Sequence, residues 1–220
     1  MRYVFLALFI VASAIHLYHS WLDDTKKRRM TKWMLLLLLL GYYLTSTSTF
    51  SGLLIAALLF SWLGDVLLMP KGNGWFVSGG ISFLVAHVRF VLLYLGQVNF
   101  AAVTWFIAVP VALVYIVIVT VILVMLKEET PKPMFIPMFL YLLMNGAMNV
   151  FALMQLLCNP CAGAAVAYIG AILFFVSDST LYLNKYYKKK DLIYKKHFTI
   201  MVTYLLGEFL ITQGMLMLGL

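Results

Sequence analysis

Charged side chains are scarce in this sequence, and their scarcity excludes an ordinary soluble domain. Only 11% of the 220 residues are charged, whereas 64% are hydrophobic. A membrane-spanning helix needs about 20 mostly apolar residues, and the apolar runs fill most of the chain when cut into such pieces. The sequence therefore predicts an all-α polytopic membrane protein, with one transmembrane domain over residues 1–220.

Signatures of several common chemistries are also missing. The chain has no Gly-rich phosphate loop, no GxSxG nucleophile elbow, no CxxCH haem motif and no HExxH zinc motif. Its two cysteines, Cys158 and Cys161, stand in the loop sequence CNPC without the βαβ context of a thioredoxin-like site. We expect either unpaired thiols or, if the loop faces an oxidising compartment, a local disulfide.

Charges, Gly/Pro clusters and polar turns divide the chain into eight predicted spans. The second and third spans separate only if TSTSTFSG (residues 45–52) forms a turn. Without that turn, residues 33–69 would form one helix of about 55 Å, which is longer than a bilayer is thick. The predicted spans cover residues 2–21, 31–46, 51–69, 75–96, 101–126, 134–157, 163–184 and 197–219.

Basic residues occur in alternate loops only. The positive-inside rule places these loops in the cytoplasm and both termini outside, and we expect the cytoplasmic membrane of a bacterium. With a net charge of +8, the expected partners of these loops are anionic membrane lipids rather than nucleic acid. The basic loops hold Lys26, Lys27, Arg28, Arg29 and Lys32, then Lys71, then Lys127 and Lys132, and finally Lys185, Lys188, Lys189, Lys190, Lys195 and Lys196.

Two aspartates inside the spans are the main functional candidates. An aspartate near the middle of a membrane helix costs roughly 2.5 to 3.5 kcal/mol, so such residues usually persist because of function. Asp65 and Asp178 come late in spans that run in the same direction, so their carboxyls share a depth. Their similar surroundings, AALLFSWLGDVLLM and GAILFFVSDSTLYL, suggest two repeated four-helix halves with a site between them. The alternative is that each aspartate only cross-links helices.

Other polar residues inside the spans allow further interpretations. Arg89 is expected to pair with a carboxylate, for which Glu208 is the candidate. His16 and His19 share one face of the first span, but interfacial hydrogen bonding is commoner than a metal site, and we predict no metal. The pair Asn145 and Asn149 on the sixth span is interpreted mainly as helix-packing contacts.

The spaced motifs SWLGDVLLM, FVSGGISFLVAHVRF and GAILFFVSDSTLYLNKYY together resemble the YhhN-like lysoplasmalogenase family of eight-span membrane proteins. TKWMLLLLL and TYLLGEFLI extend the resemblance over nearly the whole chain. It implies hydrolysis of the vinyl-ether bond of lysoplasmalogens to a fatty aldehyde and a glycerophospho-headgroup. It also implies catalytic roles for Asp65 and Asp178 and matches the family's histidine to His87. Two departures are Arg89-Phe90, where a small or apolar residue and Tyr are expected, and Glu208, where Gln is usual.

This chemistry needs one proton donor and one negative charge, because protonating a vinyl ether yields an oxocarbenium ion that water then attacks. Two carboxyls in a low-dielectric site supply both, as in glycosidases. One of Asp65 and Asp178 is expected to be the general acid while the other stabilises the cation and activates water. No metal or cofactor is needed. His87 would orient a carboxylate or bind the phosphate of the lysophospholipid substrate, and the remaining candidates for orienting or binding are Ser61, Ser177, Asn184, Arg89 and Glu208.

A competing hypothesis is a proton- or cation-coupled transporter of lipids or small molecules that uses the same two aspartates. Pro110 and Pro137 have no clear counterparts in the first half of the chain, which argues against the broken, repeated helices of such proteins. A third hypothesis is a structural protein in which the polar residues only hold helices together.

Overall fold

The computed structural model describes residues 1–188 and 193–220, which form helices and no strands. Six of the helices, α1 and α4 to α8, are long and apolar enough to cross a membrane. The predicted all-α polytopic membrane bundle is therefore confirmed. The elements are α1 (Arg2–Trp21), α2 (Thr25–Ser46), α3 (Gly52–Leu67), α4 (Asn73–Leu95), a short 3-10 helix (Phe100–Ala102), α5 (Trp105–Leu126), α6 (Lys132–Cys158), α7 (Ala162–Tyr186) and α8 (Lys196–Met217).

The predicted turn between the second and third spans is present. Helix α2 ends at Ser46, and the Ser51 side chain caps α3 by accepting a hydrogen bond from the Leu54 amide. The start of α2, however, differs from the prediction of residue 31. Asp24 caps this helix and accepts a 3.1 Å hydrogen bond from the Lys27 amide, which lowers the pKa of Asp24. The basic segment after Asp24 is therefore helical, not a loop.

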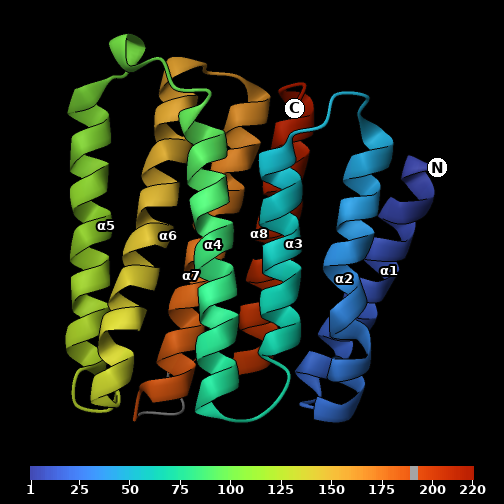
Figure 1. The fold of residues 1–220 in the computed structure, drawn as a ribbon, viewed down its shortest axis with the longest axis vertical. Helices are drawn as coiled ribbons and strands as arrows, with labels where there is room; N and C mark the ends of the chain where they lie inside the picture. The colour runs from blue at the N-terminus through green and yellow to red at the C-terminus, as the bar shows by residue number, and fades with distance from the viewer. Residues whose placement is uncertain (189–192) are drawn as a thin grey trace.

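The connections between the helices lie at two opposite ends of the bundle (Figure 1). The α1–α2, α3–α4 and α5–α6 connections lie at one end, together with the end of α7 and the start of α8. Both termini and the other three connections lie at the opposite end. All the predicted basic loops thus share the first end, which we call the basic end. Lys189 and Lys190 of the last basic loop lie outside the described residues.

The helices of the two halves of the chain pack in the same order. Within each half, consecutive helices contact one another, from α1 to α4 and from α5 to α8. In addition, α4 packs on α6 and α8 packs on α2, so the last helix of each half contacts the second helix of the other. Contacts of α1 with α8 and of α5 with α7 depart from this symmetry. At the level of helix packing, the structure agrees with the predicted repeat.

Glycines allow close helix contacts beside the predicted site residues. A Cβ atom on Gly214 of α8 would lie 2.6 Å from the backbone nitrogen of Ala167 on α7. A Cβ atom on Gly64 of α3 would lie 2.5 Å from the ring of Phe83 on α4. Small residues at such crossings let membrane helices approach closely. They bring α7 against α8 and α3 against α4, the helices that hold the two aspartates and their neighbours.

Candidate active site

Asp65 lies near the end of α3 and is joined to two other helices. The side chain is almost fully buried, at 2% exposure. Its Oδ1 atom is 3.0 Å from the ammonium of Lys32 on α2, and its Oδ2 atom accepts a 2.8 Å hydrogen bond from the Tyr204 hydroxyl on α8. A buried carboxylate is tolerated when an opposite charge and hydrogen bonds compensate for lost water. The ion pair with Lys32 and the hydrogen bond from Tyr204 offset part of the cost of burying the Asp65 carboxylate.

Asp178 on α7 has different neighbours, although it is similarly buried. Its Oδ2 atom accepts 2.7 Å hydrogen bonds from the Tyr141 hydroxyl and from the Asn145 side-chain amide, both on α6. The other oxygen, Oδ1, accepts no hydrogen bond from the described residues. No lysine or arginine among these residues pairs with Asp178. Neutral donors thus hold one oxygen of the Asp178 carboxyl group and leave the other without a hydrogen bond from the described residues.

His87 on α4 is the third member of the Asp178 cluster. Its Nδ1 atom is 2.7 Å from the backbone carbonyl oxygen of Phe83, and a carbonyl only accepts, so Nδ1 carries a proton. In a neutral ring the Nε2 atom then has a lone pair, and it lies 3.3 Å from Oδ2 of Asp178. This contact is not aligned as a hydrogen bond, which is common at catalytic sites before substrate binds. His87 is therefore placed to exchange a proton with Asp178.

Packed aromatic rings connect the two carboxyl clusters. The ring centroid of Phe174 is 4.9 Å from that of His87 and 5.4 Å from that of Tyr204. His87, which contacts Asp178, and Tyr204, which donates to Asp65, thus pack on the same Phe174 ring. The structure brings Asp65, Asp178 and His87 into one region, as the sequence predicts.

Polar contacts on α6 extend behind Asp178. The Asn149 side chain donates to the backbone carbonyl of Asn145, and the Tyr115 hydroxyl of α5 donates to Asn149. Asn145, in turn, donates to Asp178. Such connected hydrogen bonds fix the orientation of buried polar side chains. The interpretation of Asn145 as a packing residue is therefore incomplete, because this side chain also binds a carboxyl group.

The predicted pair between Arg89 and Glu208 is wrong. Glu208 is fully buried on α8, and neither carboxyl oxygen forms a hydrogen bond or an ion pair with the described residues. The hydroxyl of Ser61 lies near Glu208, although no hydrogen bond with good geometry is formed. Arg89 is half-buried on α4 and likewise makes no ion pair within the described part of the chain. Helix packing directs the two side chains to different surroundings.

Two further predicted residues do not contact either aspartate. The Ser177 hydroxyl donates a 3.0 Å hydrogen bond to the backbone carbonyl of Ile200, so it links α7 to α8. Asn184 is half-buried near the end of α7 and has no side-chain hydrogen bond with the described residues. Although Ser177 precedes Asp178 in the chain, neighbouring residues on a helix point in different directions.

The two histidines of α1 form no hydrogen bond or ion pair with either aspartate among the described residues. The Nδ1 atom of His16 is 2.8 Å from the hydroxyl of Thr31 on α2. Within residues 1–188 and 193–220, no group of three or more His, Cys, Asp and Glu side chains is arranged to hold a metal ion. Cys158 and Cys161 are both free thiols.

Four residues were not predicted as partners of the aspartates: Lys32, Tyr141, Asn145 and Tyr204. One signal for them was present. Tyr141, Asn145 and Asn149 recur every four residues, and Tyr204 precedes Glu208 by the same interval, so each set shares one helix face. Lys32 had no comparable signal, because the residues around it read as a basic loop.

Fold and site together define a polytopic helical membrane protein with a buried pair of unequal carboxyl groups between its halves. The model of the YhhN family matches residues 27–215, nearly the whole chain. The chain belongs to the YhhN family, which confirms the resemblance seen in its motifs. No curated protein and no solved structure gives a significant match. The matched range includes both aspartates and every partner described above.

Proposed function

We propose that this protein hydrolyses the vinyl-ether bond of lysoplasmalogens and releases a fatty aldehyde and a glycerophospho-headgroup. Membership of the YhhN family is consistent with this activity. The observation that carries the proposal is the difference between two buried carboxyls: Asp65 pairs with an ammonium, whereas Asp178 has neutral donors and an imidazole. Vinyl-ether hydrolysis needs one carboxyl group of each kind.

Asp178 is the proton donor in this mechanism. Its free oxygen, Oδ1, gives a proton to the alkene carbon that is not bonded to oxygen, and the ether oxygen then shares the positive charge of an oxocarbenium ion. Tyr141 and Asn145 hold the other oxygen and fix the direction of the carboxyl group. His87, whose Nε2 atom lies 3.3 Å from Oδ2 of Asp178, contacts the same held oxygen and helps to orient the carboxyl group.

Asp65 is the negative charge in this mechanism. Its carboxylate stabilises the oxocarbenium ion and takes a proton from the attacking water, as the second carboxylate does in glycoside hydrolysis. The product of this step is a hemiacetal. As the hemiacetal collapses to aldehyde and alcohol, that proton moves to the glycerol oxygen, and the proton of the hemiacetal hydroxyl returns to Oδ1 of Asp178, so that protons balance over the cycle. Lys32 and Tyr204 position the Asp65 carboxylate.

The cellular setting follows from the distribution of charge. We place the basic end of the bundle in the cytoplasm of a bacterium, with both termini outside the cytoplasmic membrane. Asp65 lies near the basic end of α3 and pairs with Lys32 in the second turn of α2. The site is therefore expected to receive lysolipids from the inner leaflet, and anionic lipids are expected around the basic loops.

The proposed function is tested by measuring aldehyde release from an alkenyl lysolipid by the detergent-purified protein. Wild type is compared with Asp65→Asn and Asp178→Asn, and an acyl lysolipid is the substrate control. We expect release from the vinyl ether only, and a loss of about a thousandfold or more in each variant. Turnover of either folded variant within a few-fold of wild type would contradict the two-carboxyl mechanism.

The rival function, a coupled transporter, is favoured by one observation, the repeated packing order of the two halves. It predicts no aldehyde from folded wild-type protein. It also predicts proton uptake into liposomes when lysolipid is added, which Asp65→Asn and Asp178→Asn abolish. The two measurements on the same preparation therefore separate the enzyme from the transporter.

A further inference from the structure

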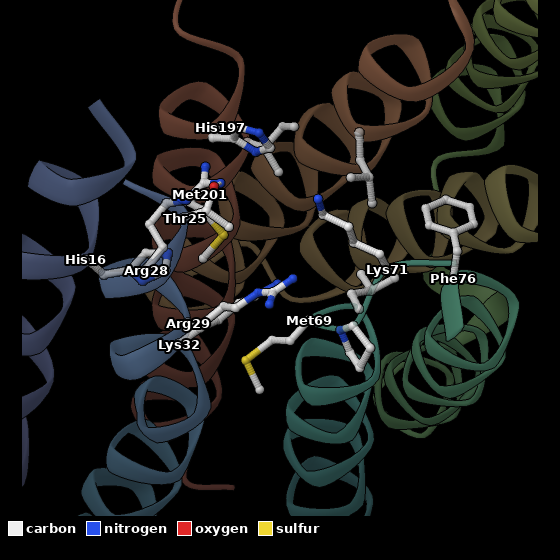
Figure 2. A pocket seen from close by; sticks show the side chains of 14 residues that line it. His16, Thr25, Arg28, Arg29, Lys32, Met69, Lys71, Phe76, His197 and Met201 are labelled. Atoms are coloured by element: carbon white, nitrogen blue, oxygen red, sulfur yellow. Dashed lines mark hydrogen bonds between the residues drawn. The ribbon is translucent and has the colours of Figure 1, made fainter. Parts of the chain in front are cut away.

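A cavity of about 280 Å³ at the basic end of the bundle concentrates positive charge. Figure 2 shows Arg29 and Lys71 reaching toward this cavity from different sides. No aspartate or glutamate within the described residues lines it. We call it the basic vestibule, and its polar lining includes Thr25, Arg28, Arg29, Lys32, Lys71 and His197.

One face of α2 supplies most of this polar lining. Thr25, Arg28, Arg29 and Lys32 follow the spacing of a single helix face, three or four residues apart. This face exists because α2 begins at Thr25. Two of the cations already have carboxylate partners: Arg28 lies 3.8 Å from Asp23, and Lys32 pairs with Asp65.

The other two cations are available for a ligand. Arg29 and Lys71 form no ion pair with any described residue, although both line the cavity. Arginine and lysine side chains that converge on a cavity suit a phosphate group, because each donates charge-assisted hydrogen bonds to its oxygens. The vestibule therefore has the chemistry of a phosphate site.

A second cavity, of about 230 Å³, lies between α4 and α6 and is mostly apolar. Ile81 and Ile136 in its lining are exposed on the outside of the bundle, where membrane helices face lipid. We call this cavity the tail groove, and its lining includes Phe76, Gly80, Ile81, Ile136, Leu140 and Tyr141.

Phe76 lines both the basic vestibule and the tail groove, so the two cavities are adjacent. Each also touches one carboxyl cluster. Lys32 of the vestibule pairs with Asp65, and Tyr141 of the groove donates to Asp178. A ligand that occupied both cavities would therefore pass between the partners of the two aspartates.

We propose that one lysophospholipid bridges the two cavities, with its phosphodiester in the basic vestibule and its hydrocarbon chain in the tail groove. The bond that the proposed function requires to be cleaved joins these two parts of the lipid, so it would lie at the junction near Phe76. The far end of the chain extends past Ile81 and Ile136 into lipid. This assignment rests on the proposed function for its reactive bond, whereas its two binding sites are testable without turnover.

The phosphate site is tested by binding to the protein in phosphatidylcholine nanodiscs. The probe is 1-O-hexadecyl-glycerophosphoethanolamine, a saturated ether that has no vinyl bond to cleave, and 1-O-hexadecylglycerol is the matched lipid without phosphate. We expect Arg29→Gln with Lys71→Gln to weaken binding of the phospholipid by about tenfold or more. Binding of hexadecylglycerol should not change, and the control Lys127→Gln, an exposed residue outside the cavity, should affect neither probe.

Two outcomes would overturn the phosphate site. One is that the double variant weakens binding of both probes equally, which would mean that Arg29 and Lys71 do not recognise the phosphate. The other is loss of probe binding in nanodiscs of phosphatidylglycerol, which would mean that headgroups of the bilayer fill the vestibule instead.

The tail groove is tested with Gly80→Leu. A Cβ atom at Gly80 has room, since its nearest neighbour, the Tyr182 hydroxyl, would be 3.9 Å away, so the helix should fold while the longer side chain fills the groove. We expect weaker binding of both probes. Gly52→Leu, at a site with nothing within 4 Å of the added Cβ, is the control. Unchanged binding of both probes to Gly80→Leu would refute the groove, whatever the aldehyde assay gives, because the probes are not cleaved.

Discussion

At the scale of single residues, the two aspartates have the same side chain but different surroundings. The ammonium of Lys32 compensates the charge of Asp65, whereas Asp178 receives hydrogen bonds from neutral groups on a single oxygen. In a medium of low dielectric constant, such neighbours decide which carboxyl is charged. The assignment of acid and carboxylate roles therefore depends on the partners rather than on the aspartates themselves.

The two tyrosines that donate to the aspartates are expected to matter for rate. Tyr141→Phe and Tyr204→Phe each remove one hydrogen bond to a carboxyl group, and we expect aldehyde release to fall about tenfold in each. Tyr42→Phe is the matched control, because the Tyr42 hydroxyl donates to Gln213 instead. Steady-state rates of the three variants test this. A larger loss in Tyr42→Phe than in the other two would contradict the assignment.

The sequence predicted the centres of the site better than their partners. Asp65, Asp178 and His87 stand out because polar residues are costly inside apolar spans. Their partners come from other helices, and which helices meet is a property of packing, not of local pattern. The Arg89–Glu208 prediction failed for the same reason, since both residues were correctly placed within helical spans but were paired without knowledge of helix contacts.

At the scale of helices, the glycine beside Asp65 sets the distance between α3 and α4. Gly64 faces the ring of Phe83, and the backbone carbonyl of Phe83 accepts the hydrogen bond from His87. The Phe83 ring also packs against Phe174 and Tyr204. A change at one glycine would therefore reach both carboxyl clusters.

We expect Gly64→Ala to destabilise the protein by about 1 to 3 kcal/mol, because the new methyl group overlaps the buried Phe83 ring. Aldehyde release should fall as well, since His87 would move with α4. Gly52→Ala is the control, because the added Cβ meets nothing within 4 Å. It should change neither the stability of the protein nor the rate of aldehyde release. Thermal unfolding in detergent measures the first effect. Equal melting temperatures for Gly64→Ala and wild type would show that α4 adapts freely.

Helix boundaries were predicted well where polar turns interrupt apolar runs. The TSTSTFSG turn is an example, because its Thr47 and Ser51 side chains accept hydrogen bonds from nearby backbone amides. The start of α2 was missed because a cluster of five basic residues reads as a solvated loop. The Asp24 cap initiates the helix before that cluster, and the error hid the role of Lys32.

At the scale of the whole molecule, charge separates the two ends of the bundle. Cys158 is the last residue of α6, and Cys161 lies in the connection between α6 and α7, at the end opposite the basic loops (Figure 1). Cys161 is exposed, which makes it a natural reporter of orientation.

We expect an impermeant maleimide to label Cys161 in intact cells. In a Cys158→Ala, Cys161→Ser background, Lys127→Cys at the basic end should be labelled only after the membrane is opened. Labelling is read by a mass shift of the purified protein. The reverse pattern would place the basic end outside and contradict the positive-inside assignment.

The most direct test of the central claim is hydrolysis of an alkenyl lysolipid in deuterium oxide, with the aldehyde trapped as it forms. Proton transfer to carbon by a carboxyl group predicts one deuterium on the carbon next to the aldehyde carbonyl, and no such product from Asp178→Asn. An aldehyde that lacks this deuterium, or the same product rate from Asp178→Asn, would contradict the mechanism.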